Sequence, residues 1–359
     1  MLPPTMLNLV LVAALALLVG GCATGPSRLQ EGTSAPQTAA ETALKSQRLG
    51  APLEERILAL NPERISATDV RDTLSKAPAP RIVLIHGGIY PVYLAMTSFA
   101  DFLVAMGYPE TALRRQDGVA DSVYSYSPYQ DSAQLAGMVA WYYEHDGMRP
   151  MIVGHSQGGV QAVKVLDELA GVFGNEIPVW NPIADAPENR TTIVDPFSGT
   201  RRPVVGVTVS YVSAVGAGGA ALLLPNQWTM VHRLRTIPDT VDEFTGFSIS
   251  GDLVALSFPG ARGASEYHAN GKAKVRNIFL PGTYNHVVIP ATRYLTADPA
   301  MRDWLDAYVP DRQGEAAVAP PGDKGGALWA GDVWYFVKKH WCLELQRLIR
   351  AGRAAPAAG

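Results

Sequence analysis

The pentapeptide Gly-His-Ser-Gln-Gly at residues 154–158 limits what this chain can fold into more than any other feature. The apolar run 151–153 before it predicts a strand, and residues 159–170 after it predict a helix. Glycines on both sides of Ser156 allow the backbone to turn sharply between the two. Such a turn lifts the hydroxyl to the helix N-terminus, where backbone amides favour developing negative charge. The pattern predicts a nucleophilic serine, and the alternative is a glycine-rich turn without chemistry.

The middle of the chain alternates between expected strands and expected helices. The strands are β-branched or apolar runs typical of a buried sheet, and they cover residues 81–85, 122–126, 151–153, 204–212, 245–250 and 275–280. The helices have apolar residues three and four apart, and they cover residues 53–60, 68–74, 97–106, 132–145, 159–170 and 329–350. This alternation predicts the α/β class, with a mostly parallel sheet and helices on both faces. Residues 181–202 interrupt it and are expected to form a loop excursion.

His286 is the expected general base, because it lies in the short loop after the last expected strand. Catalytic groups of open α/β sheets gather at the carboxyl ends of the strands. His155 lies inside the sharp turn and is badly placed to reach its neighbour's hydroxyl, and His86 is expected to hold its own loop. His268 is the reserve candidate, and the alternative for His286 is a loop histidine that binds water.

Asp252 is the expected acid, because it follows the strand 245–250 in a Gly-Asp turn. A carboxylate at that place can orient the imidazole and stabilise its protonated form. The other candidates lie either at the wrong end of this strand or in the excursion after the nucleophile helix, and they are Asp239, Asp242, Glu243, Asp185 and Asp195. One of them stays open as an alternative acid.

In chain order, the His-Gly loop at 86–87, the turn at 154–158, the Gly-Asp turn at 251–252 and the Asn-His loop at 285–286 form one series. From about residue 81 to 308 the chain resembles the α/β-hydrolase superfamily, and its lipase and esterase branch in particular. The resemblance implies the α/β-hydrolase fold and a triad in its usual chain order.

The resemblance assigns a role to each candidate residue. His286 would take the proton from Ser156, and Asp252 would hold His286. The backbone N–H of Gln157 and that of Gly88 or Ile89 would form the oxyanion hole. An acyl-enzyme would form without a metal or an organic cofactor.

The first residues predict export. Residues 7–19 are apolar apart from Asn8, which suits a secretory signal peptide over residues 1–21. Val-Gly-Gly at 19–21 leads into Cys22 and resembles the lipobox of bacterial lipoproteins, although Leu is preferred at position 19 and no Lys or Arg precedes the run. The expectation is a lipid anchor on Cys22 in the cell envelope; the alternative is an ordinary cleaved signal peptide. Ala23 favours the outer membrane.

Four segments are expected along the chain. Residues 1–21 form the signal peptide, 22–78 a lipidated tether and lead-in, 79–310 the hydrolase domain, and 311–359 a linker and terminal helix. Residues 214–235 are apolar and glycine-rich, so they form either a small cap or part of the core. Cys342 is expected to be a packed thiol. The net charge of −3 and the 18% of charged residues argue against nucleic acid as a partner.

The predicted function is hydrolysis of carboxylic esters, with a small-molecule or lipid ester as substrate. The same motif serves acyltransferases and peptidases, so these stay open. A further alternative is a non-catalytic envelope scaffold that docks a partner on its aromatic terminal helix. Exposure of Trp334, Phe336 and Trp341 would favour that alternative, and their burial would weaken it. The sequence does not indicate an oligomeric state.

Overall fold

The computed structural model describes residues 49–116, 123–257, 262–310, 319–322 and 325–354. The chain divides into two units, Met1–Ala35 and Pro36–Gly359, and all described residues belong to the second. The predicted signal peptide, Cys22 and the start of the tether therefore lie outside the described residues. Within the described ranges, no helix combines the length and the apolar character that a membrane span requires.

A six-stranded sheet forms the centre of the described unit, in the order β12-β10-β8-β3-β1-β2, and all neighbouring strands are parallel. Its strands are β1 (Ile82–Ile85), β2 (Ser125–Tyr126), β3 (Met151–His155), β8 (Val209–Val215), β10 (Val241–Ile249) and β12 (Lys274–Leu280). The residues of β1, β3 and β8 are buried throughout, as expected of strands covered on both faces. The predicted α/β class with a parallel central sheet is confirmed.

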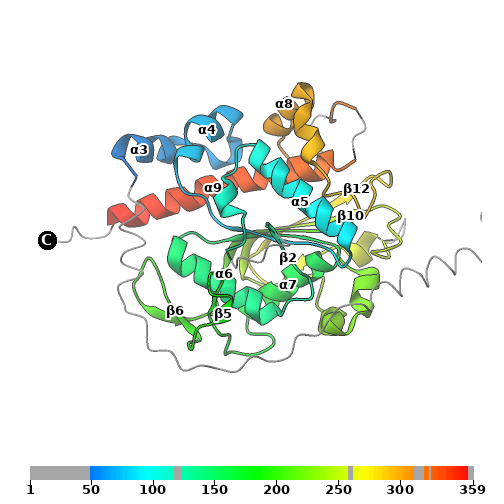
Figure 1. The fold of residues 1–359 in the computed structure, drawn as a ribbon, viewed down its shortest axis with the longest axis horizontal. Helices are drawn as coiled ribbons and strands as arrows, with labels where there is room; N and C mark the ends of the chain where they lie inside the picture. Colours follow the sequence, from blue (N-terminus) through cyan, green and yellow to red (C-terminus); the bar gives the residue numbers. More distant parts are fainter. Residues whose placement is uncertain (1–48, 117–122, 258–261, 311–318, 323–324, 355–359) are drawn as a thin grey trace, which may run out of the picture. The chain divides into compact units, whose positions relative to one another are not determined.

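Helices cover both faces of this sheet (Figure 1). One face carries α6 (Ser132–Asp146) and α7 (Gln157–Leu169), and the other carries α5 (Tyr90–Ala105) and α9 (Ala327–Ala354). Successive strand residues point to opposite faces. Leu84 accordingly belongs to the core beneath α5 and α9, and Val83 belongs to the core beneath α6 and α7.

Several predicted boundaries differ from the structure. Helix α5 begins at Tyr90 instead of residue 97, because Pro91 in its first turn suits a helix start and the segment from Tyr90 has no other breaker. Strand β10 begins at Val241, so Asp242 and Glu243, which were expected before it, lie inside its amino end, whereas Asp239 still precedes it. Helix α8 (Pro299–Ala307) was not predicted.

The excursion and the expected cap contain short elements. The excursion holds two antiparallel pairs, formed by β4 (Trp180–Asn181), β5 (Ala186–Pro187), β6 (Thr192–Val194) and β7 (Arg201–Pro203). The cap range contains the end of β8 and then two short 3-10 segments, η4 (Gly219–Leu223) and η5 (Pro225–Met230). The two-residue strand β9 (Thr236–Ile237) follows directly after it.

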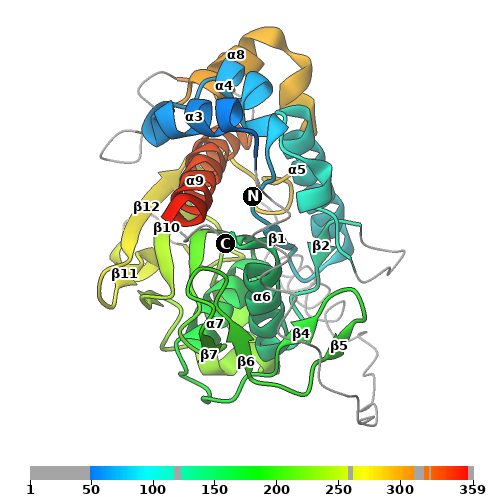
Figure 2. The same ribbon diagram turned by 90° about the vertical axis from the view of Figure 1, so that its left-hand side faces the viewer.

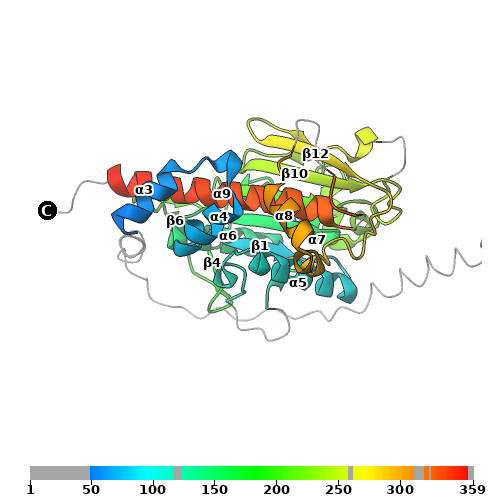
Figure 3. The same ribbon diagram turned by 90° about the horizontal axis from the view of Figure 1, so that it is seen from above.

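Helix α9 is part of the core. Trp329, Trp334 and Trp341 are fully buried, and Phe336 is 4% exposed. On the side of α9 away from the sheet lie α8 and the lead-in helices α3 (Ala51–Ala59) and α4 (Ala67–Asp72), as Figures 2 and 3 show. Segments that lie before and after residues 79–310 in the sequence thus pack into one hydrophobic core with the sheet.

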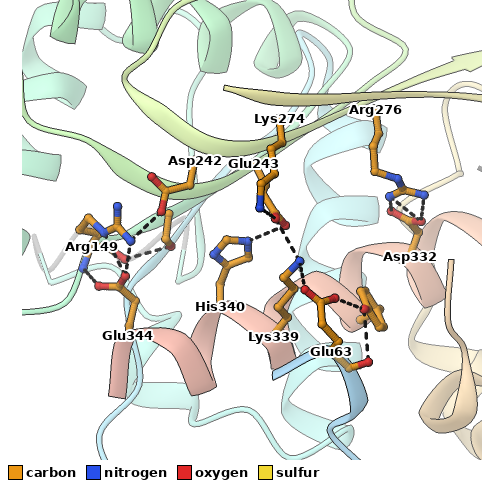
Figure 4. A network of polar contacts seen from close by, with 12 residues as sticks. Glu63, Arg149, Asp242, Glu243, Lys274, Arg276, Asp332, Lys339, His340 and Glu344 are labelled. Carbon is orange, nitrogen blue, oxygen red and sulfur yellow. Dashed lines mark hydrogen bonds and ion pairs between the residues drawn. The ribbon is translucent and has the colours of Figure 1, made fainter. Parts of the chain in front are cut away.

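Ion pairs fix α9 to the sheet (Figure 4). Asp332 pairs with Arg276 of β12 at 3.1 Å. Glu344 pairs with Arg149 at 2.7 Å, and its own side chain is fully buried. Near the amino end of β10, Glu243 accepts from Lys339 at 3.0 Å and from Lys274 at 3.1 Å. Removal of one partner from such a buried pair leaves an uncompensated charge and costs about 3–5 kcal/mol.

Candidate active site

Ser156 stands at the sharp turn between β3 and α7, as the sequence predicts. Its φ of 55° and ψ of −122° are unusual for a residue with a side chain. Backbone held in such a region costs on the order of 1–3 kcal/mol and persists only where the surroundings enforce it. Here the Ser156 N–H donates to the Val215 carbonyl at 2.8 Å, which ties the turn to the end of β8. The hydroxyl is held at the N-terminus of α7.

The glycines that flank Ser156 are required by space. A Cβ on Gly154 would lie 2.3 Å from the Gly158 carbonyl oxygen, and a Cβ on Gly158 would lie 2.2 Å from the Ile85 carbonyl oxygen. Both contacts are with backbone atoms, and shifting the backbone would cost much more energy than moving a side chain. A Cβ on the next glycine, Gly159, would lie 2.9 Å from the Cβ of Ala217. The sequence motif is therefore a packing requirement of this turn.

Ser156, His286 and Asp252 form a continuous hydrogen-bonded series. The Ser156 Oγ lies 2.9 Å from His286 Nε2, and His286 Nδ1 lies 2.6 Å from Asp252 Oδ2. Since Asp252 can only accept when ionised, Nδ1–H donates to it and Nε2 is left to accept the serine proton. His286 is 9% exposed and Asp252 is 7% exposed.

The carboxylate of Asp252 is held by its own loop. Its Oδ1 accepts the backbone N–H groups of Val254 at 2.9 Å and Ala255 at 3.1 Å. These bonds leave Oδ2 for the imidazole. The loop after β10 thus fixes both the position and the rotation of the acid.

His155 has a role that the sequence did not predict. It is fully buried, and its Nε2 lies 2.7 Å from the His286 backbone carbonyl. Burial, aided by the neighbouring His286, holds the pKa of His155 well below its usual value, so the ring is neutral. Nε2–H therefore donates to the carbonyl. His155 therefore ties the turn that carries Ser156 to the loop that carries His286.

Gly216 is a second residue that the sequence analysis missed. It follows β8 with a φ of 63°, and a Cβ there would lie 2.9 Å from Cε1 and 3.0 Å from Nδ1 of His286. Only a residue without a side chain leaves room for the imidazole between Ser156 and Asp252. The signal that could have revealed it is the glycine-rich stretch 216–219 directly after a strand.

The His-Gly-Gly loop after β1 lies against Ser156. A Cβ on Gly87 would be 3.0 Å from the Ser156 Cβ, so glycine permits this close approach. His86 Nδ1 lies 2.6 Å from the Gly87 carbonyl, and burial lowers the pKa of His86. His86 therefore holds its loop, as expected. Ile89 begins α5 as its N-cap and is 38% exposed.

Gln157 connects the two segments that were expected to supply oxyanion donors. As the first residue of α7, it has a backbone N–H without an intrahelical partner. Its side chain reaches the other segment, because a Cβ on Gly88 would lie 2.4 Å from Gln157 Oε1. The residue is 2% exposed, and its amide oxygen and nitrogen have no hydrogen-bond partner among the described residues. Tyr129 Oη donates to the Gly88 carbonyl at 3.2 Å from the other side.

The alternative acids and the reserve histidine make other contacts and do not bond to Ser156 or His286. Asp195, Asp185 and Asp239 accept hydrogen bonds from Tyr143, Trp180 and Ala273, respectively. Asp242 and Glu243 lie in the amino-terminal part of β10 and pair with cations there. His268 is exposed in β11 (His268–Ala269), which pairs with β9. Burial raises the pKa of the Cys342 thiol to about 12, consistent with a packed side chain.

A cavity of about 360 Å³ lies away from Ser156, beside the amino ends of β10 and β12. Its cationic lining residues are Lys274, Arg276 and Lys339. All three pair with carboxylates, so the cavity offers no free charge to a ligand. Among the described residues, no group of three or more His, Cys, Asp or Glu side chains could hold a metal ion.

Comparison with known proteins adds little to this site. No protein-family model matches the chain. No curated protein matches it either. Among solved structures, the chain is similar to one described as "RedJ with PEG molecule bound in the active site", with 15% identity over 65% of this chain and 92% of that chain and a TM-score of 0.29. A TM-score this low carries no argument about function, so the interpretation depends on the geometry of the site.

Proposed function

We propose that this chain is a serine hydrolase that cleaves carboxylic esters through Ser156, His286 and Asp252. The observation that supports this most directly is the hydrogen-bonded series of 2.9 Å and 2.6 Å that joins the three side chains. The strained turn at Ser156 supports it further, because backbone strain of this kind is found mostly where function requires it.

In the acylation step, His286 Nε2 takes the proton from the Ser156 hydroxyl while Oγ attacks the ester carbonyl. The tetrahedral oxyanion would accept hydrogen bonds from the Gln157 N–H and from the N–H of Gly88 or Ile89. Asp252 stabilises the imidazolium. The C–O bond to the alcohol then breaks, and the imidazolium returns its proton to the departing alcohol.

In the deacylation step, the same imidazole takes a proton from water, and the hydroxide oxygen attacks the acyl carbonyl. The bond to Ser156 Oγ breaks, the proton returns to the serine, and the carboxylic acid leaves. His286 acts as base and then as acid in both halves, so one histidine serves the whole cycle.

Two other reactions fit the same residues. An alcohol in place of water would make the chain an acyltransferase, and an amide in place of the ester would make it a peptidase. Against the non-catalytic scaffold stands the burial of Trp334, Phe336 and Trp341, the aromatic residues on which such docking would depend.

The test compares the wild type with Ser156→Ala. We expect a fluorophosphonate probe to label the wild type and p-nitrophenyl esters to be hydrolysed, and both signals to disappear in the variant. A correctly folded wild type that neither reacts with the probe nor hydrolyses any ester would overturn the proposal. Added alcohol acceptors and a peptide amide substrate separate hydrolase from acyltransferase and peptidase.

The cellular location is proposed from the sequence alone. We infer that residues 1–21 direct export and that Cys22 receives a lipid anchor that holds the chain in the cell envelope. In cells labelled with a fatty-acid analogue, the wild type should carry the label and Cys22→Ser should lack it. Label on both proteins, or on neither, would contradict lipidation of Cys22.

A further inference from the structure

Gly88 lies in the loop that was expected to supply the second oxyanion donor, and it has no side chain to fix its backbone. A Cβ on Gly88 would lie 2.4 Å from Gln157 Oε1, so the packing of Gln157 requires glycine there. Glycine has more backbone freedom than any other residue. A donor that rotates away from the oxyanion stabilises no charge, so other residues must hold this part of the loop.

Two side chains hold the peptide groups on either side of Gly88. The Gly87 carbonyl lies 2.6 Å from His86 Nδ1, and the Gly88 carbonyl accepts from Tyr129 Oη at 3.2 Å. No peptide bond among the described residues is cis, so the N–H of each peptide points away from its carbonyl. A held Gly87 carbonyl therefore sets the direction of the Gly88 N–H, and a held Gly88 carbonyl sets that of the Ile89 N–H.

The two bonds differ in where they come from. His86 is the chain neighbour of Gly87 and moves with the loop. Tyr129 lies 41 positions away, in the loop after β2. Within the part of the chain that the structure describes, its hydroxyl makes the only hydrogen bond that joins residues 87–89 to a segment other than their own loop and α5. Tyr129 is therefore the external support of these residues.

The backbone of Tyr129 is itself held on both sides. The carbonyl before it, of Pro128, accepts from Asn226 Nδ2 at 3.4 Å. The carbonyl after it, of Gln130, accepts from Gln161 Nε2 at 2.7 Å. Gln161 belongs to α7, the helix whose first N–H is the other expected oxyanion donor. The bonds from α7 through Tyr129 to the loop thus fix the two expected donor segments relative to each other.

The hydroxyl of Tyr129 is suited to a lasting donor role. A carbonyl oxygen can only accept, so the tyrosine must keep its proton. Partial burial raises the pKa of Tyr129 above its usual value, so the hydroxyl stays protonated well past neutral pH.

We propose that Tyr129 is a positioning residue of the oxyanion hole, which holds the Gly88 carbonyl so that the N–H groups of this loop face the oxyanion formed at Ser156. It does not contact the substrate. The proposal rests on the proposed function, because it concerns the transition state of acyl transfer. The ester carbonyl carries little charge before attack, so loss of this support should lower kcat and leave KM unchanged.

The experiment compares Tyr129→Phe with Tyr294→Phe in the full chain. Tyr294 is the matched control, because its Oη donates to the Gly325 carbonyl at 2.7 Å. It is 50% exposed, against 48% for Tyr129. Each variant therefore loses one hydrogen bond from a half-exposed tyrosine to a glycine carbonyl, and any general effect on folding is shared.

Kinetics on a soluble p-nitrophenyl ester give the first readout. We expect Tyr129→Phe to lower kcat about tenfold with KM within twofold of wild type, because removal of an oxyanion donor costs about 100- to 1,000-fold and a loosened donor costs less. Tyr294→Phe should keep both constants within twofold of wild type.

A trifluoromethyl ketone gives a readout of the oxyanion without a leaving group. Ser156 Oγ adds to the carbonyl carbon, the serine proton passes to His286, and the carbonyl oxygen becomes the oxyanion. The inhibition constant of this compound should rise in Tyr129→Phe by the factor by which kcat/KM falls, and it should stay near the wild-type value in Tyr294→Phe.

Nuclear magnetic relaxation in Ser156→Ala measures the loop without any turnover. The order parameters of the Gly88 and Ile89 N–H groups should lie near the value of rigid backbone, about 0.85, and fall to about 0.6 or below when Tyr129→Phe is added. Addition of Tyr294→Phe should leave them unchanged.

Four results would overturn the proposal. They are a loss of kcat below twofold in Tyr129→Phe, an equal loss in Tyr294→Phe, a rise in KM at constant kcat, and unchanged order parameters in the loop. The third would show that Tyr129 binds substrate, and the fourth that other contacts hold the loop. A wild type that hydrolyses no ester would refute the proposed function, whereas the order parameters would still decide whether Tyr129 holds Gly88.

Discussion

Strand β10 carries a carboxylate–histidine pair at each end, and the two pairs differ in what surrounds them. After its carboxyl end, Asp252 Oδ2 lies 2.6 Å from His286. Near its amino end, Glu243 Oε2 lies 3.2 Å from His340. Both histidines are buried or nearly so, at 9% and 1% exposure. The chemical groups are the same, so composition alone cannot tell which pair is suited to catalysis.

The groups that contact each pair decide which of the two is suited to catalysis. Asp252 has one imidazole and two backbone N–H groups, and the far nitrogen of that imidazole faces a partly exposed hydroxyl. Glu243 has two cationic neighbours, Lys274 and Lys339, and accepts from the imidazole of His340, whose Nδ1 is buried without a partner among the described residues. The first pair can move a proton to a substrate. The second is enclosed by α9 and stabilises the fold.

The largest effect should come from amidation of Asp252, the proposed catalytic acid. Asp252→Asn keeps an oxygen for the N–H groups of Val254 and Ala255 but no longer stabilises the imidazolium, so kcat/KM on a soluble ester should fall about 10⁴-fold. The melting temperature should stay within a few degrees of wild type. A loss of less than tenfold in ester kinetics would show that another carboxylate serves His286.

The same amidation at the other end of β10 should affect stability instead. In Glu243→Gln the surrounding cations lose their counter-charge, so the free energy of unfolding at pH 7 should fall by about 3 kcal/mol. The folded variant should keep its activity. Denaturant titration and ester kinetics on one preparation measure both, and a variant as stable as wild type would contradict the structural role.

The difference in the free energy of unfolding between wild type and Glu243→Gln should depend on pH in a definite direction. Burial acts to raise the pKa of Glu243, but His340 and Lys339 outweigh it and hold the pKa well below its usual value. A carboxylate with a lowered folded pKa stabilises the protein above its unfolded pKa, about 4.3 for Glu, and loses that stabilisation as the pH falls. The gap between wild type and Glu243→Gln should therefore be full at pH 7 and shrink below about pH 4. A constant gap would argue against an electrostatic origin.

A methyl group beside His286 should have an intermediate effect. Gly216→Ala places a Cβ within 3.0 Å of the imidazole, and a displaced base costs roughly 10- to 100-fold in kcat. Gly199→Ala is the matched control. The φ of Gly199 is 66°, close to the 63° of Gly216, but no heavy atom lies within 4 Å of the position that its Cβ would take. Both variants share the backbone strain, so equal kinetic losses would remove the steric explanation.

The smallest effect is expected at the Gln157 side chain, which contacts Gly88. Gln157→Met keeps the shape and the backbone donor but removes the amide, so kcat should fall about tenfold or less while KM stays near wild type. Gln161→Met one turn later breaks the bond to the Gln130 carbonyl and should lower stability more than kcat. A larger kinetic loss in Gln161→Met would contradict the positioning role of Gln157.

The sequence predicted the parts of this molecule that depend on local pattern. The buried strands, the turn at Ser156 and the loops that carry Asp252 and His286 all follow from runs of apolar residues and the glycines beside them. The predicted positions of Ser156, Asp252 and His286 also bring the three side chains into hydrogen-bonding distance. Chain order and the rule that sites gather at carboxyl ends were sufficient for that.

The contacts that were missed depend on residues distant in sequence. His155 holds the His286 carbonyl across 131 positions, and Gly216 is needed because an imidazole from another loop occupies the space beside it. The start of β10 was misplaced because Asp242 and Glu243 are polar, although α9 and Arg149 supply their partners. No local pattern contains these partners, so only the folded arrangement reveals them.

The place of α9 in the chain has a consequence for biogenesis. This helix supplies the buried partners of Arg149 and Arg276 and the three tryptophans over the sheet, yet it follows every strand in the order of synthesis. A nascent chain that has released all of these strands has α5 on one sheet face but still lacks α9 beside it. Native packing must wait for α9, so the growing polypeptide remains open to chaperones until this helix has been synthesised.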